Sequence, residues 1–233
     1  MKTQSNYQDL LKTIALITMI IDHLGLYLFP EYEVMRLIGR TAMPIFCLFA
    51  GYNFKQKPNQ SVLAFGVLLF LITYIMIEQF ITTNILISIY IGQCYLYLFQ
   101  NKLKNFFTGY FHVIILGAIW PFTFSLFDYG TLSIAIMILG YIAKHDKSNL
   151  KTAIGITMIL SVFHTINVFN FSPIYVVTAI GLAFIQYLFM SMVNFNQPLG
   201  INVNILSRNM LFIYFAHLAL IQALWFYHII GWW

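Results

Sequence analysis

Residues 10–29 read LLKTIALITMIIDHLGLYLF, an apolar run of the length that crosses a bilayer as one helix. Lys12 stands near its start, and Asp22 and His23 interrupt it near its end. A charged start before an apolar run is typical of a signal peptide, but no small-residue cleavage site follows. Because further apolar runs come after it, this stretch predicts a retained first membrane helix.

The whole chain has the composition of that first stretch. Of its 233 residues, 61% are hydrophobic and only 8% are charged, and the mean hydropathy is +0.81. Soluble domains carry roughly a quarter charged residues, so the composition excludes a soluble enzyme, a disordered chain, a nucleic-acid binder and a disulfide scaffold. Cys47 and Cys94 fall inside apolar runs, which predicts packing rather than a disulfide. We expect an all-α, polytopic transmembrane helical bundle that forms one domain over residues 1–233.

Polar clusters and turn residues divide the chain into about nine candidate spans. The sixth has only about 15 residues, which predicts a helix that is tilted, re-entrant or half-buried. The segments are 10–29, 34–54, 60–78, 81–99, 106–127, 129–143, 150–169, 172–193 and 204–229.

The charged residues predict the orientation of these spans. If the N-terminus lies inside and the spans alternate, all nine lysines and Arg208 fall on one side of the membrane. Glu31, Glu33, Glu78 and Asp128 fall on the other side. Since lysine and arginine collect in cytoplasmic loops, the pattern predicts a cytoplasmic N-terminus and a C-terminus outside. Topology also accounts for the net charge of +5.

Two ionisable residues near the end of the first span oppose two near the start of the second. The first pair is Asp22 and His23, and the second is Arg36 and Arg40. At about 1.5 Å per residue, His23 and Arg40 each lie roughly 9 Å from the outer helix ends, so the turn at Pro30 brings them to one level. A mid-membrane charge costs about 2.5–3.5 kcal/mol, and pairing Asp22 with Arg40 would offset much of that.

Two interpretations of this group stay open. In the first, Asp22 and Arg40 form a structural ion pair that locks the two helices, while Arg36 extends towards Glu33. In the second, the net charge of plus one on Asp22, Arg36 and Arg40 holds an anionic ligand, such as a phosphate or a developing oxyanion. Arginine suits this second role because its guanidinium grips phosphate with two hydrogen bonds.

Two further histidines lie on polar stripes of later spans. His217 follows Tyr214 by three residues in the last span, and His164 precedes Asn167 by three in the seventh. Residues three apart share a helix face. Each histidine is therefore either a core residue with satisfied hydrogen bonds or part of a site.

Three polar residues mark the expected outer helix ends: Glu78, Asp128 and Tyr129. They are either solvated termini or the lining of an outer mouth. No two His, Cys or Asp residues have zinc spacing on one helix, so no metal is expected. The phosphate-binding glycine motifs are absent as well.

Four segments, in order along nearly the whole chain, resemble the TraX family, the membrane acetylases of conjugative pilin and their relatives. The second segment also looks like the Arg-x-x-x-Pro-x-Phe pattern of the broader acyltransferase 3 group. The four are residues 11–25 with Asp22-His23, residues 36–46 with Arg36, Arg40 and Pro44, the tripeptide Asp128-Tyr129-Gly130, and residues 214–218 with Tyr214 and His217.

The resemblance implies an acetyl-CoA-dependent acetyltransferase in the inner membrane of a bacterium. Acetyl-CoA would be the co-substrate and would enter from the cytoplasm, and the acceptor would come from outside. In TraX the acceptor is the N-terminal amine of pilin, and relatives in the wider group acylate sugars or glycans. The resemblance therefore implies an amine or a hydroxyl on a pilin, a secreted peptide or a glycan, with membrane lipids around the protein.

The same resemblance suggests roles for the polar residues. His23 is the expected general base, or a transient acyl carrier. Asp22 either orients His23 or pairs with Arg40, and His217 completes the catalytic group. The expected donor-binding residues are Arg36, Arg40, Arg208 and Tyr214, and the expected acceptor-binding residues are Glu78, Asp128, Tyr129 and His164.

Two other classes of function fit the same residues. A small proton- or anion-coupled transporter would also carry intramembrane charges such as Asp22, His23 and Arg40. Inverted repeats would support that class, and the sequence shows none. In a structural or immunity-type membrane protein, the charges would only lock helices together.

Overall fold

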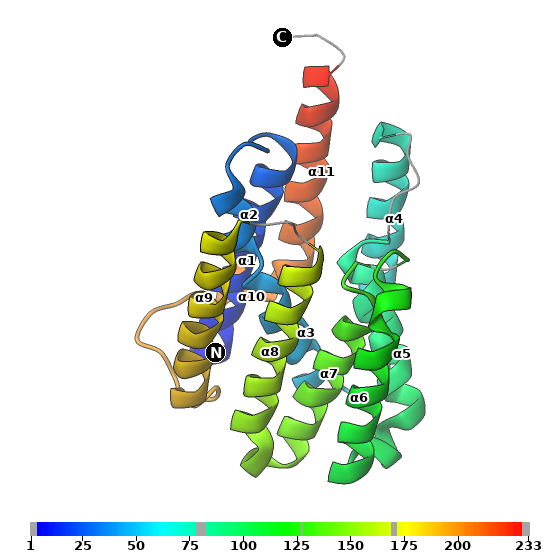
Figure 1. Ribbon diagram of the computed structural model, residues 1–233, viewed down its shortest axis with the longest axis vertical. Coiled ribbons are helices and arrows are strands. Elements are labelled where there is room, and N and C mark those ends of the chain that lie inside the picture. The colour runs from blue at the N-terminus through cyan, green and yellow to red at the C-terminus, as the bar shows by residue number, and fades with distance from the viewer. Residues whose placement is uncertain (1–3, 78–82, 127, 169–171, 230–233) are drawn as a thin grey trace.

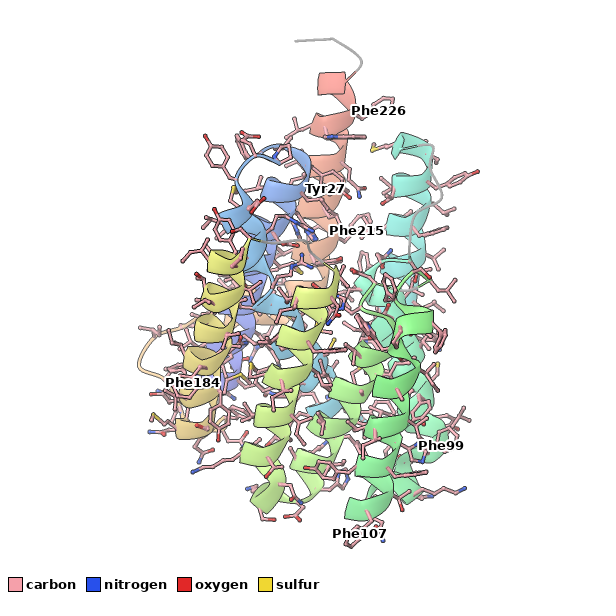
Figure 2. The ribbon with its side chains drawn as sticks, viewed as in Figure 1. Tyr27, Phe99, Phe107, Phe184, Phe215 and Phe226 are labelled. Carbon is pink, nitrogen blue, oxygen red and sulfur yellow. The ribbon has the colours of Figure 1, made fainter. Side chains whose placement is uncertain are left out.

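The computed structural model describes residues 4–77, 83–126, 128–168 and 172–229, and within these ranges the chain is helical with no β-strand. The all-α class is therefore confirmed. The long helices run roughly along one axis (Figure 1). Figure 2 shows Tyr27 and Phe226 towards one end of the bundle, which we call the upper end, and Phe107 at the opposite, lower end.

The helices follow the apolar segments closely. Each of the nine segments contains a helix, but two segments are divided, and some boundaries shift by up to four residues. The elements are α1 (Tyr7–Tyr27), α2 (Glu33–Gly39), α3 (Ala42–Tyr52), α4 (Gln60–Ile77), α5 (Ile85–Leu103), α6 (Phe106–Thr123), α7 (Gly130–His145), the 3₁₀ turn η1 (Lys147–Asn149), α8 (Leu150–Val168), α9 (Pro173–Met192), α10 (Asn204–Arg208) and α11 (Met210–Ile229).

Four helical stretches among the described residues are long and apolar enough to cross a membrane. They are Tyr7–Tyr27, Glu33–Tyr52, Lys147–Val168 and Pro173–Met192. Four more helices are apolar but shorter. The chain thus has the helical character of a membrane protein, and the count of nine spans and the orientation of the termini stay predictions.

Helix α7 forms the centre of the bundle. Of its 16 residues, 13 are buried, and it packs against α3, α5, α6 and α8. A helix that is apolar around its whole circumference belongs in a protein core. The short sixth segment is therefore enclosed by its neighbours rather than half-buried.

Two glycines allow α3 and α7 to touch along their backbones. A Cβ atom on Gly51 would overlap the main-chain carbonyl of Met137, and a Cβ atom on Gly140 would overlap that of Leu48. Close contact through small residues is the usual means of joining helices in membranes. This contact fixes α7 against the helix that follows the charged segment.

The second expected span breaks at Arg40 and Thr41, between the end of α2 at Gly39 and the start of α3 at Ala42. Pro44 lies in the first turn of α3. It has no amide hydrogen, and its ring is incompatible with a helical bond to the carbonyl of Arg40, four residues earlier. Gln186 of α9 donates to the nearby carbonyl of Thr41 at 3.1 Å. The break therefore leaves Arg40 at the end of a short helix, where its side chain turns inward.

The start of α1 is tied to the segment that precedes α11. Asn6 and Asp9 form a capping box at the first turn of α1. The amide of Leu199 donates to the carbonyl of Ser5 at 2.7 Å, and the amide of Val203 donates to the Ser5 hydroxyl at 2.9 Å. These bonds set α1 beside α10 and α11, which it contacts along its length.

We predict that Gly140→Ala destabilises the protein and that Gly181→Ala does not. Both glycines lie inside helices, but a Cβ atom on Gly181 meets nothing within 4 Å. Overpacking costs typically about 1–3 kcal/mol, whereas alanine at an open helical position gains up to about 1 kcal/mol. Thermal unfolding in detergent measures both. Equal melting temperatures for the two variants would contradict the contact between α3 and α7.

Candidate active site

A cavity of about 350 Å³ opens between α1, α2, α3, α5, α8, α11 and the turn that joins α6 to α7. It brings together residues from seven parts of the chain. The sequence singled out all of its charged and aromatic polar residues, and Ser125 is the one addition. Its polar lining is Asp22, His23, Arg36, Arg40, Ser125, Asp128, Tyr129, His164 and Tyr214.

Asp22 binds both arginines through one carboxylate oxygen. Arg40 contacts Oδ2 through Nη2, and Nη1 of Arg36 lies 3.0 Å from the same oxygen. Arg36 also donates to the backbone carbonyl of Asp22 at 3.2 Å. The side chains of Asp22 and Arg40 are 7% and 9% exposed, so this cluster is desolvated. The expected pairing of Asp22 with Arg40 is thus present, and Arg36 joins it.

Glycine makes this pairing possible at the contact between α1 and α2. A Cβ atom on Gly39 would overlap the side chain of Asp22. The two helices are therefore close enough for Arg36 and Arg40, one turn apart, to reach a single carboxylate.

Asp128 changes the charge of the cavity. Asp22, Arg36 and Arg40 sum to plus one, but Asp128 lines the same cavity. With both carboxylates ionised, the four charges sum to zero. Asp128 therefore lowers the positive charge that the sequence suggested for this cavity, which disfavours a multiply charged phosphate here.

His23 and His217 form a hydrogen-bonded pair that joins α1 to α11. Nδ1 of His23 lies 2.8 Å from Nε2 of His217, and the two rings stack with centroids 5.1 Å apart. Tyr214 covers both imidazoles, with its ring 5.9 Å from His23 and 5.5 Å from His217. Asp22, which is engaged by the arginines, does not orient His23, and His217 takes that place.

The bonds around this pair define which nitrogen of each neutral ring carries a proton. Nδ1 of His217 lies 2.9 Å from the carbonyl of Ile213, and a carbonyl only accepts, so this nitrogen carries the hydrogen. Nε2 of His217 is then an acceptor, and Nδ1 of His23 donates to it. It follows that Nε2 of His23 bears a lone pair, which is the arrangement of a general base held by a second residue.

The turn Asp128-Tyr129-Gly130 forms a third wall. Tyr129 and Gly130 both have positive φ, 65° and 53°, a conformation that a tyrosine adopts only where its surroundings hold it. The hydroxyl of Ser88 donates to the carbonyl of Asp128 at 3.1 Å, which fixes the turn. Asp128 is partly exposed and lines the cavity, which agrees with the second alternative for this residue, the lining of a mouth.

Tyr129 links this turn to the arginine cluster. Arg40 donates through Nη1 to the Tyr129 hydroxyl at 2.8 Å. The Tyr129 ring packs at a tilt of 41° against His164, with centroids 4.5 Å apart. His164 is 5% exposed and also contacts Trp120, so it supports Tyr129 from behind.

Two sequence candidates are absent from the cavity lining among the described residues. The first, His217, reaches the site through its hydrogen bond to His23. The second, Arg208, ends α10 and is exposed. The structure therefore gives it no place in donor binding at this site. Glu78 lies outside the described residues.

Comparison of the sequence with protein families gives a match that covers the segments that line this cavity. The sequence model described as TraX protein matches residues 7–225, which include every residue of the cavity. The chain belongs to the TraX family. No solved structure matches the chain.

Three relatives are similar to different extents. The chain is 46% identical to "Uncharacterized protein RP591" of Rickettsia prowazekii over 97% of its own length and 95% of that protein. It is 38% identical to Protein TraX of Escherichia coli, but over only 22% of this chain and 21% of that protein. Protein TraX of E. coli strain K12 is 37% identical over 24% of this chain and 23% of that protein.

We predict that Asp22→Asn destabilises the protein by about 3–5 kcal/mol, because it leaves two buried guanidinium groups without their carboxylate. The double variant Asp22→Asn with Arg40→Gln should recover part of that loss, since one of the two charges is gone. Thermal unfolding in detergent of these two variants and of Arg40→Gln alone tests this. If the losses of the two single changes simply add, the side chains are not coupled.

Proposed function

We propose that this protein is an integral membrane acetyltransferase that moves an acetyl group from cytoplasmic acetyl-CoA to an extracytoplasmic amine. The nine segments would cross the inner membrane of a bacterium, with the N-terminus in the cytoplasm and the C-terminus outside. Family membership and the segregation of lysines from acidic residues along the sequence support this arrangement. The acceptor would be the N-terminus of a pilin or of another secreted peptide, or an amine on a glycan.

The observation that carries the proposal is the position of Nε2 of His23. It bears a lone pair in the neutral ring, and His23 lines the main cavity beside the two arginines. A neutral imidazole is an adequate base for an N-terminal amine, whose pKa is about 7.7–8.0 in model peptides. A hydrophobic enclosure with fixed donors is also the setting in which an oxyanion is best stabilised.

The side chains divide the transfer into complementary roles. The ammonium first loses one proton to solvent and becomes a neutral amine. His23 then accepts a second proton as the amine nitrogen forms a bond to the thioester carbonyl carbon. Arg36 and Arg40, held by Asp22, stabilise the negative charge that develops on the carbonyl oxygen. When the carbon–sulfur bond breaks, His23 returns the proton to the departing CoA thiolate. His217 keeps His23 in the required tautomer throughout.

Asp128 favours an amine over a hydroxyl as the acceptor. A second cavity of about 200 Å³ borders the first and shares His23, Leu26, Asp128 and Tyr214 with it. The rest of its polar lining is neutral: Tyr27, Thr73, Thr83, Asn84 and Gln222. An ammonium that enters this cavity meets one carboxylate, Asp128, which lies next to the base. A sugar hydroxyl has no charge for Asp128 to recognise and is harder for an imidazole to deprotonate.

The experiment is transfer of labelled acetyl from acetyl-CoA to a peptide with a free N-terminus, using protein purified in detergent. We predict that His23→Ala lowers the rate at least about 100-fold. His217→Ala should lower it less, because Nε2 of His23 remains but its tautomer is no longer fixed.

His112→Gln is the matched control for these variants. His112 contacts Tyr95 and is absent from the described lining of both cavities, so its change should leave the rate intact. Full activity of a correctly folded His23→Ala protein would contradict the role of His23. A peptide with a blocked N-terminus should accept no label.

A further inference from the structure

Three cavities follow one another through the bundle. The first is the candidate active-site cavity of about 350 Å³, which we call the His23 cavity. It shares Met19, Phe46, Ile85 and Tyr214 with a different cavity of about 390 Å³. We call this cavity of about 390 Å³ the arm cavity. It shares Phe54 and Lys55 with a third cavity of about 310 Å³, which we call the nucleotide cavity. The shared residues place the three cavities next to one another in a row from the imidazole to the ends of α3, α5 and α7.

The far part of this row of cavities is strongly basic. Lys12, Lys55 and Lys57 line the arm cavity, and Lys55, Lys104 and Lys144 line the nucleotide cavity. No aspartate or glutamate is among the described residues that line either cavity. The five lysines thus provide a charge of plus five around two adjoining spaces, in contrast to the balanced charges around His23.

The observed contacts of Lys144 and Lys12 leave hydrogens on both ammonium groups for an anion. Lys144 donates to the carbonyl of Phe54 at 3.0 Å, which uses one of its three hydrogens. Nζ of Lys12 lies 5.8 Å from the centre of the Phe49 ring. Asp9, one turn before Lys12, attracts its ammonium group, and the Asp9 carboxylate also accepts from the backbone amide of Asn6 at 3.1 Å.

The distance along the row of cavities matches one chemical class of ligand. Lys12 and His23 are eleven residues apart on α1, or about 16 Å at the rise of an α-helix. The pantetheine arm of CoA, from sulfur to pyrophosphate, has the length of about four extended residues, or about 15 Å. Between the two residues the arm cavity has aromatic and aliphatic walls, including Phe46, Phe49 and Ile89.

We propose that the five lysines hold the phosphates of a CoA donor and that the arm cavity holds its pantetheine arm. Lys12, Lys55 and Lys57 bind the pyrophosphate, and Lys104 and Lys144 bind the 3′-phosphate in the nucleotide cavity. The thioester then lies beside His23. This inference rests on the proposed function, and it moves phosphate binding from Arg36 and Arg40 to the lysines.

Binding of CoA, dephospho-CoA and pantetheine to the full-length protein in detergent, measured by calorimetry, tests this assignment. Lys104→Gln should weaken CoA about tenfold and leave dephospho-CoA, which lacks the 3′-phosphate, unchanged. Lys55→Gln with Lys57→Gln should weaken both nucleotides and leave pantetheine unchanged. Lys151→Gln is the control, because Lys151 is exposed at the start of α8 and is absent from the described lining of both cavities.

Each other outcome overturns the proposal. Unchanged CoA affinity in the lysine variants would do so, as would an equal loss for CoA and dephospho-CoA in Lys104→Gln. If the lysines instead bind anionic lipid, vesicles of phosphatidylglycerol would lose affinity for the variants while CoA would not.

The binding data also separate this inference from the proposed function. Lysine-dependent CoA binding without acetyl transfer to any amine would refute the function and keep the donor site. Acetyl transfer with an unchanged KM for acetyl-CoA in the lysine variants would keep the function and refute the donor site.

Discussion

A carboxylate held between two guanidinium groups inside an apolar bundle is the constraint on which the rest of the site depends. Asp22 is costly to bury alone, and so are Arg36 and Arg40, but together they offset most of that cost. Satisfying all three requires α2 to lie close against α1, which Gly39 permits, and requires a break at Arg40 and Thr41. The same geometry points the arginines at the cavity beside His23.

The histidine pair gives this rigid cluster its chemistry. His23 comes from α1 and His217 from α11, and the bonds that fix the start of α1 to the segment before α11 set the two helices side by side. Charge then separates three environments. The lysine-lined cavities suit phosphates. The His23 cavity, where arginines face carboxylates, suits an uncharged thioester. The cavity of about 200 Å³, in which Asp128 is the carboxylate, suits an ammonium. In the proposed reaction, donor and acceptor meet at His23 from different directions.

Residue patterns along the sequence predicted the helices and much of the site, but they could not predict the features that depend on how the helices pack. Apolar length located the helices, and depth along two antiparallel helices paired Asp22 with Arg40. The depth of a residue in the membrane could not show that Asp22 makes no hydrogen bond to the adjacent His23. That depends on side-chain direction, and neighbouring residues on a helix point in different directions. Asp128 was ambiguous because burial of a helix end depends on distant helices. The lysines indicated only topology, since no spacing along the chain shows that Lys12, Lys55 and Lys104 line adjoining cavities.

The most direct test of the account is to place a reactive carbon where the thioester carbon should lie. Bromoacetyl-CoA carries bromine on the carbon next to the thioester carbonyl. A nucleophilic nitrogen displaces the bromide and becomes covalently bonded to that carbon. The account predicts that mass spectrometry finds the adduct on His23, that excess CoA prevents it, and that Lys55→Gln with Lys57→Gln slows it. Labelling confined to lysines or cysteines, with His23 unmodified, would contradict the meeting of donor and base in this cavity.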